Sequence, residues 1–290
     1  MASNTLSAGI RHTPGQRAYQ VFKYVVCIFL AVLSIFPFLV MAVNATRTTT
    51  QIQAHPISLL FGTNFLKNLD ILLSKNMFNP LVGLRNSFII SAGATILTVY
   101  FSSLTAYALV AYEWKLRALF FTIILAVMMI PGTVTSIGFY SFIYKIGWTN
   151  NLLPLIIPAV AAPGTVFFMR QFMIPSLPME IVQSARVDGA SEFRTFNQIV
   201  LPIMKPAMAT QAIFAFVGNW NNLFIPQILL TDSKVYTMPI MVSLLNGDVY
   251  KTEYGAIYLG ILLTVLPIFV IYFALSKYII AGVALGGVKE

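Results

Sequence analysis

The sequence predicts an all-α polytopic membrane protein with six transmembrane helices. Hydrophobic residues make up 58% of the chain, and charged residues only 9%. Soluble domains carry about 25% charged residues, so most of this chain requires an apolar environment. The apolar residues also gather into runs close to the roughly 20 residues that a helix needs to cross a bilayer.

The six predicted spans lie at 24–43, 87–110, 118–143, 152–169, 207–230 and 256–275. The first run follows Arg11, Arg17 and Lys23, as a signal peptide would. Its apolar core is longer than the roughly 7–15 residues of a signal peptide, so we expect a retained span. Prolines predict kinked helices that could surround a cavity, with ordinary helix irregularity as the alternative; they are Pro37, Pro131, Pro158, Pro163, Pro226 and Pro267.

The basic residues predict the orientation of the spans. With the N-terminus inside, most of the 18 lysines and arginines fall in inner segments, including the long loop 170–206. This bias follows the positive-inside rule and predicts that both termini are cytoplasmic. The net charge of +9 is then explained by loops that face the cytoplasm and anionic lipid, so we do not expect nucleic acid as a partner.

The interiors of the predicted spans contain no Asp, Glu, Lys, Arg or His. Proton-coupled carriers and pumps need ionisable residues within the membrane, so the sequence argues against them. Sodium coupling through carbonyls and hydroxyls remains open, but energy supplied by another subunit is favoured. The sequence shows no cluster of His, Cys or carboxylates suited to a metal site or an enzyme.

A polar, charged segment interrupts this apolar chain between Pro178 and Pro206. Ser176 could cap a first short helix, and Gly189 permits a sharp turn after it. Ser191 could cap a second helix, which we expect Pro202 to end.

An apolar stripe runs along the second helix of this segment, formed by Phe193, Phe196 and Val200. These residues fall on one helical face because helical neighbours recur every three to four positions. The stripe could dock into a groove of another protein. Alternatively, it packs against the ends of the protein's own helices.

The same segment resembles the EAA loop of ABC-importer permeases, in its carbohydrate-uptake branch. The matching residues are Glu180, Gln183, Ser184, Ala185, Asp188, Gly189, Ala190, Leu201 and Pro202. Gln183 and Ser184 replace the usual Glu and Ala. Further similarity to this branch, which includes the maltose permease subunits, lies at Thr105–Ala108, at Trp220 with Asn221, and in the maltose-type G-subunit ending Gly282–Lys289.

The resemblance implies a type I ABC-importer permease fold, with residues 1–290 forming one transmembrane permease domain in a bacterial inner membrane. It also implies a heterodimer with a second permease, two cytoplasmic ATPase subunits and an extracytoplasmic solute-binding protein. The chain has no phosphate-binding loop of the G-x-x-x-x-G-K-[ST] type. We therefore expect no enzyme activity and no cofactor in this chain, with ATP and Mg²⁺ on the ATPases.

The resemblance further implies that loop 170–206 carries a coupling helix for the ATPases. Its expected contacts are Glu180, Gln183, Ala185, Asp188, Gly189, Ala190, Phe193 and Phe196. The terminal Gly287, Val288 and Lys289 are expected to reach toward the ATPases, with a free end as the alternative.

The resemblance implies a carbohydrate substrate, in particular an oligosaccharide, and amides and aromatic rings near membrane depth suggest a path for it. Sugars are well bound by amides and aromatic faces, and the candidates are Asn219, Trp220, Asn221, Asn222 and Tyr140. Hydrogen bonding between helices is the alternative role. Two other functions remain open: an ABC permease for a non-sugar solute, and an ion-coupled secondary carrier.

Overall fold

The structure, a computed structural model, describes residues 14–74, 78–245 and 252–287, and the regular elements in these ranges are helical, as the sequence predicts. The chain forms two compact units. One comprises Met1–Leu69 with Glu253–Leu262, and the other comprises Asp70–Thr252 with Leu263–Glu290. Their boundaries pass through α3 (Phe65–Ser74) and α14 (Tyr254–Gly287).

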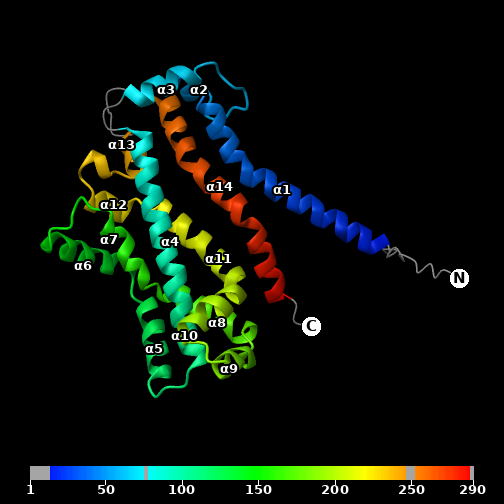
Figure 1. Ribbon diagram of the computed structural model, residues 1–290. Helices are drawn as coiled ribbons and strands as arrows, with labels where there is room; N and C mark the ends of the chain where they lie inside the picture. The colour runs from blue at the N-terminus through cyan, green and yellow to red at the C-terminus, as the bar shows by residue number, and fades with distance from the viewer. Residues whose placement is uncertain (1–13, 75–77, 246–251, 288–290) are drawn as a thin grey trace. The chain divides into compact units, whose positions relative to one another are not determined.

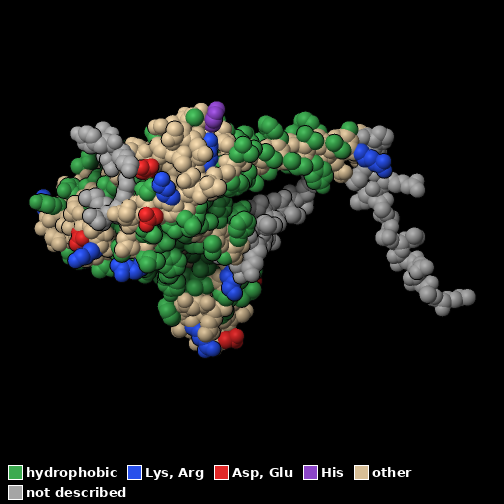
Figure 2. Space-filling model, turned by 90° about the horizontal axis from the view of Figure 1, so that it is seen from above, with side chains coloured by type: hydrophobic (Ala, Val, Ile, Leu, Met, Phe, Trp, Pro, Cys, Tyr) green, Lys and Arg blue, Asp and Glu red, His purple; other side chains and the backbone are tan. Residues whose placement is uncertain are grey.

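The first unit contains α1 (Pro14–Asn44) and α2 (Thr49–Ala54). Large apolar side chains cover α1 and are exposed along most of its length (Figure 2). A soluble helix would bury at least one such stripe. An apolar surface on all sides is the property of a helix that lies in lipid.

Arg47 holds together the turn that follows α1. Its side chain is only 7% exposed, and its guanidinium donates to Asn44 Oδ1 at 2.9 Å, His55 O at 2.8 Å and Gln51 O at 2.8 Å. The Asn68 amide donates to the Arg47 carbonyl oxygen at 2.9 Å. A buried cation is stable only when acceptors surround it, and this turn supplies them from neutral groups.

The second unit is built around α4 (Pro80–Ala111), which packs against α8 (Pro163–Ser176) and α11 (Leu201–Trp220) (Figure 1). Small side chains on α4 allow neighbouring backbones to approach closely. The buried ones include Ser87, Ser91, Ala94, Thr98, Ser102 and Ser103.

Shorter elements gather at the two ends of α4 (Figure 1). At one end lie α5 (Arg117–Met128), α9 (Met179–Val187) and α10 (Glu192–Thr195). Toward the other lie, in chain order, α6 (Gly132–Lys145), α7 (Leu153–Ile156), η1 (Ile157–Val160), α12 (Phe224–Leu229), η3 (Ser233–Val235) and α13 (Met238–Leu245). Each end has its own apolar core, one centred on Phe196 and Met173, the other on Ile143 and Leu229.

Within the described residues, five helices are long and apolar enough to cross a membrane: Gly15–Asn44, Pro80–Ala111, Leu153–Ser176, Glu192–Trp220 and Tyr254–Ala274. The prediction of one continuous third span at 118–143 is wrong, because α5 ends at Met128 and α6 begins at Gly132. Pro131 lies in the break and caps α6. It has no N–H to donate, and it disfavours helical backbone at Ile130.

The predicted fifth span, 207–230, is displaced in the structure. Its helix α11 begins at Leu201 and ends at Trp220, and α12 follows as a separate short helix. Pro202 does not end the preceding helix, because α10 continues through a π-helical turn, η2 (Phe196–Val200), directly into α11. In that turn the Leu201 N–H donates to Phe196 O, five residues back. The wider turn brings the chain to Pro202 within the first turn of α11, where a proline is tolerated.

Candidate functional site

The polar segment folds into two short helices and a tight turn, which we call the α9–α10 loop (residues 179–195). Gly189 has φ of +76°, so the predicted glycine turn is confirmed. Ser191 caps α10 by accepting a hydrogen bond from the Arg194 N–H, also as predicted. Ser176 does not cap α9, because it is the last residue of α8, and Pro178 takes the cap position.

The predicted apolar stripe is divided between the surface and the core. Phe193 is 69% exposed, whereas Phe196 and Val200 are fully buried. Phe196 packs against Tyr107 of α4, with ring centroids 5.6 Å apart. The expectation that Phe196 contacts a partner is therefore wrong for this conformation, since its ring is enclosed by the unit itself. Val187, which the motif did not single out, is 88% exposed.

A hollow of about 340 Å³ lies on the α9–α10 loop and brings together Ala185, Asp188, Gly189 and Ala190 from the predicted set. Arg194 and Gln198 also line it. Glu180 and Gln183 are exposed on α9 but do not line this hollow. The loop therefore offers a concave surface, and two exposed apolar side chains, Val187 and Phe193, lie on either side of Gly189 along the chain.

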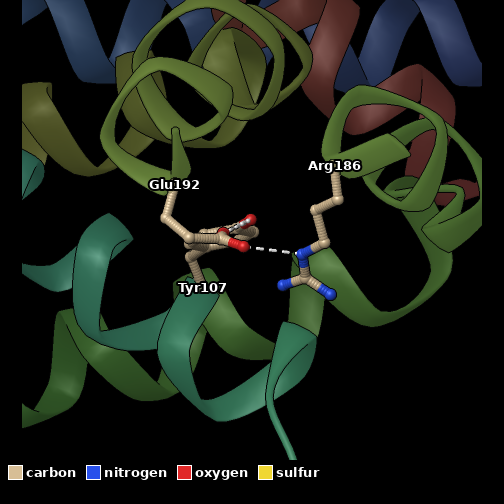
Figure 3. Close-up of polar contacts among 3 residues, drawn as sticks. All are labelled: Tyr107, Arg186 and Glu192. Carbon is tan, nitrogen blue, oxygen red and sulfur yellow. Dashed lines mark hydrogen bonds and ion pairs between the residues drawn. The ribbon is translucent and has the colours of Figure 1, made fainter. Parts of the chain in front are cut away.

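An ion pair connects α9 to α10 (Figure 3). Arg186 Nε donates to Glu192 Oε1 at 2.6 Å, and the Tyr107 hydroxyl of α4 donates to Glu192 Oε2 at 3.0 Å. The guanidinium also lies over the Tyr112 ring, 5.0 Å from its centroid. The hydrogen bond that Arg186 donates to the Glu192 carboxylate raises the pKa of Arg186 above its usual value, so the pair stays charged.

We call these three residues, Tyr107, Arg186 and Glu192, the latch. They fix both helices of the loop to the end of α4, although Tyr107 lies 85 residues before Glu192. Sequence reasoning missed the latch. Its one available signal was a pair of opposite charges on either side of the glycine turn, which by itself does not identify a contact to α4.

A second hollow, of about 520 Å³, lies between α6, η1 and the end of α11, and we call it the outer hollow. Its polar and aromatic lining includes Asn219 and Asn222, which the sequence predicted, and Thr135, Ser136 and Phe139, which it did not. Both asparagines are half-buried. The lining residues of the outer hollow include no Asp, Glu, Lys, Arg or His.

The other residues expected on the substrate path lie outside this lining. Trp220 is only 2% exposed, stacks on Phe216 and donates from Nε1 to Thr264 O of α14 at 2.9 Å. Its contacts match the alternative of hydrogen bonding between helices. Asn221 is exposed just after α11. The ring of Tyr140 lies beside that of Tyr144, with the ring centroids 6.1 Å apart.

The expected C-terminal contacts fall at the edge of the described chain. Gly287 is the last residue of α14. Val288 and Lys289 lie outside the described residues.

This chain is similar in sequence to membrane subunits of binding-protein-dependent transport systems. A family model described as the binding-protein-dependent transport system inner membrane component matches residues 98–284. The arabinooligosaccharides transport system permease protein AraQ of Halalkalibacterium halodurans is 33% identical over 265 residues, covering 90% of this chain and 93% of that protein. The lactose transport system permease protein LacG of Rhizobium radiobacter is 32% identical over 274 residues, covering 94% of this chain and 98% of that protein.

A solved structure shares the fold. It is the crystal structure of a bacterial ABC transporter involved in the import of the acidic polysaccharide alginate. One of its chains matches with a TM-score of 0.78 and 18% identity, over 93% of this chain and 100% of that chain.

Proposed function

Because the chain belongs to the family of binding-protein-dependent transport system inner membrane components, we propose that it forms half of the translocation pathway of an ATP-driven carbohydrate importer. It is a multi-pass membrane protein and a transport subunit of the ABC type, similar to permeases named for arabinooligosaccharides and lactose. Residues 1–290 serve as one permease domain, although they fold as two compact units.

The importer assembles this chain with a second permease, two cytoplasmic ATPase subunits and an extracytoplasmic solute-binding protein. The family description names the dependence on a binding protein. ATP and Mg²⁺ act on the ATPase subunits, and this chain carries neither. In the bacterial inner membrane both termini face the cytoplasm, and α5 with α6 together make the third of six crossings.

The observation that carries the proposal is the surface of the α9–α10 loop. Val187 is 88% exposed and Phe193 is 69% exposed, on both sides of a turn that the latch holds in place. Exposed apolar side chains around a polar hollow are typical of a protein interface. We assign this loop as the coupling helix, with Glu180, Gln183, Ala185, Asp188, Gly189, Ala190 and Phe193 facing the ATPase and Phe196 supporting them from below.

Two further assignments belong to this proposal. The tail formed by Gly287, Val288 and Lys289 extends α14 toward the ATPases. Asn219 and Asn222 line the sugar path through the outer hollow, while Asn221 and Tyr140 border it. Trp220 holds the wall in place through its bond to Thr264.

Substitution of Gly189 tests the coupling assignment. Gly189→Val places a branched side chain in the left-handed region and adds bulk to the loop surface, so we expect the ATPase to be lost when the complex is purified from detergent-solubilised membranes. Gly147→Val is a matched control, since Gly147 has φ of +70° and, like Gly189, open space around its missing side chain.

The two variants separate backbone strain from docking. Strain at a left-handed position costs about 1–2 kcal/mol in both. Retention of the ATPase by Gly189→Val, or its equal loss from Gly147→Val, contradicts the coupling assignment.

A further inference from the structure

The polar atoms that face the outer hollow are arranged mainly as hydrogen-bond acceptors. Thr135 Oγ1 and Ser136 Oγ both donate to Gly132 O, at 2.8 and 2.7 Å. Asn219 Nδ2 donates to Ala215 O at 2.8 Å. These bonds occupy the hydroxyl hydrogens of Thr135 and Ser136 and one of the two amide hydrogens of Asn219, and they leave the three side-chain oxygens free to accept from a ligand.

Asn222 differs from these three residues. Its half-buried side chain makes no hydrogen bond to any described residue, so both its amide hydrogens and its carbonyl oxygen remain available. Because the side chain is only half-buried, these groups are open to water and to a ligand. A ligand that offers both acceptors and donors could bond both ends of this amide.

The hollow also has an apolar side, formed by Phe139 with Pro158 and Leu155. Aromatic rings pack well against the C–H faces of sugar rings, because those faces are apolar while the hydroxyls project from the ring edge. The hollow has about 520 Å³ of space, within the roughly 300–1,000 Å³ of typical small-molecule sites.

The charge of the lining decides the class of sugar. Since no charged side chain lines the hollow, a carboxylate or phosphate entering it would lose its hydration without meeting a cation. Such a transfer is strongly unfavourable. A neutral sugar loses only hydroxyl hydration, and the oxygen acceptors replace it.

We propose that the outer hollow is a subsite for one or two rings of a neutral, hydroxyl-rich saccharide, with Thr135, Ser136 and Asn219 accepting from sugar hydroxyls. Asn222 donates to a ring or glycosidic oxygen, and Phe139 packs on the C–H face. This inference rests on the proposed function and adds to it a substrate class, neutral rather than acidic, and three residues of α6 that determine specificity.

The test uses the complete importer in proteoliposomes, with this full-length chain, its partner permease, ATPases and binding protein. Uptake is measured for maltotriose, lactose and an arabinan-derived trisaccharide as neutral probes, and for an alginate trisaccharide as the acidic probe. ATP hydrolysis is recorded in the same vesicles. The wild type is expected to take up at least one neutral probe and to exclude the acidic one.

Removal of single hydroxyls is the first set of variants. Thr135→Ala and Ser136→Ala should each raise the KM for the neutral probe about two- to tenfold, the factor that corresponds to one lost hydrogen bond, with the maximal ATPase rate unchanged. Thr122→Ala is a matched control. Its hydroxyl also donates to its own helix, to Ala118 O at 2.9 Å, but it lies on α5, outside the hollow. This variant should leave the KM unchanged.

A cation placed in the hollow is the second variant. Asn222→Lys should lose uptake of the neutral probe and gain uptake of the alginate trisaccharide, because the ammonium now pairs with its carboxylates. A merely structural defect would lower uptake of the neutral probe without any gain in uptake of the acidic one. Protein amount and melting temperature are measured in detergent for each variant, and the comparison uses those that match the wild type.

The outcomes separate the inference from the proposed function. If the wild type takes up a neutral probe but Thr135→Ala, Ser136→Ala and Asn222→Lys all behave like Thr122→Ala, the subsite is wrong and the importer assignment stands. Preference of the wild type for the acidic probe also overturns the neutral class. If no probe is taken up with ATP and binding protein present, the carbohydrate assignment fails, and the inference fails with it.

Discussion

At the scale of single residues, the latch is a weak interaction, and we expect it to affect function more than folding. The side chains of Arg186 and Glu192 are 33% and 42% exposed, so solvent screens their attraction and the pair contributes at most about 1 kcal/mol to folding. We expect the location of the latch, between the loop and α4, to matter more for function than its small contribution to folding. The latch is the polar link between the surface of the α9–α10 loop and α4.

We expect Glu192→Gln and Tyr107→Phe each to reduce sugar uptake per ATP hydrolysed, with only a small fall in melting temperature. Both substitutions keep the shape of the side chain and remove a charge or a hydroxyl. If the two residues act through one hydrogen bond, the double variant should lose less than the sum of the single losses.

Tyr100→Phe is the matched control for this pair. Tyr100 also lies on α4 and packs on Phe196, but its hydroxyl donates to Asn197 Oδ1 at a longer distance of 3.3 Å. A loss of coupling in Tyr100→Phe as large as in Tyr107→Phe would argue against a specific latch. Strictly additive losses would do the same.

At the scale of the elements, the turn after α1 depends on one buried cation. Arg47 satisfies the carbonyl oxygens of Gln51 and His55 and the side chain of Asn44. Methionine has a similar volume but no donors. Arg47→Met would therefore leave these acceptors unpaired inside the first unit.

We expect Arg47→Met to destabilise this unit by about 2–4 kcal/mol, the cost of several buried acceptors without partners. Limited proteolysis of the full-length protein in detergent should show faster cleavage in residues 45–64. Arg85→Met is the control, because the exposed Arg85 side chain bonds its neighbour Asn86 and, within the described parts of the chain, no other residue. Equal protection of the Arg47 variant and the wild type would show that the bonds are dispensable.

The sequence predicted the local turns and helix caps correctly. It failed where contacts between residues far apart in the sequence determine which side chains are buried. Local chemistry was sufficient for the glycine turn at Gly189 and the cap at Ser191, since both depend on neighbouring backbone. Helical spacing placed Phe193 and Phe196 on one face. In the structure Phe196 packs against Tyr107, whereas Phe193 is exposed. A contact between residues so far apart in the sequence cannot be predicted from a local pattern. Trp220 was likewise ambiguous until its partner Thr264, 44 residues later, was known.

At the scale of the whole molecule, the division of the third predicted span into α5 and α6 leaves the number of membrane crossings to be determined. Composition alone identified a polytopic membrane protein, and the positive-inside bias predicted both ends inside. The number of crossings depends on whether α5 and α6 together traverse the bilayer. Neither helix alone is long enough, because a crossing needs about 20 residues and they contain 12 and 14.

Cysteine labelling in intact cells tests the six-span topology. Cys27 is the single cysteine of the chain, so a Cys27→Ser background is free of native thiols. We expect Lys145→Cys to react with a membrane-impermeant maleimide from outside. Lys115→Cys should react only after permeabilisation. Labelling of both positions from the same side would mean that α5 and α6 form a re-entrant hairpin, and that the prediction of six crossings is wrong.

The π-helical turn at Phe196–Val200 can also be described as one surplus residue in an otherwise α-helical rod. Each residue of an α-helix rotates the rod by about 100°, so the length of this short stretch sets the angular phase between the α9–α10 loop and α11. Deletion of Gln198 should restore α-helical bonding and preserve helix content by circular dichroism. It should also turn Glu192 away from Tyr107 and abolish uptake, whereas substitution of Gln198 by alanine should be tolerated. In this helix the number of residues, more than their identity, sets how the surface of the α9–α10 loop is oriented relative to α11.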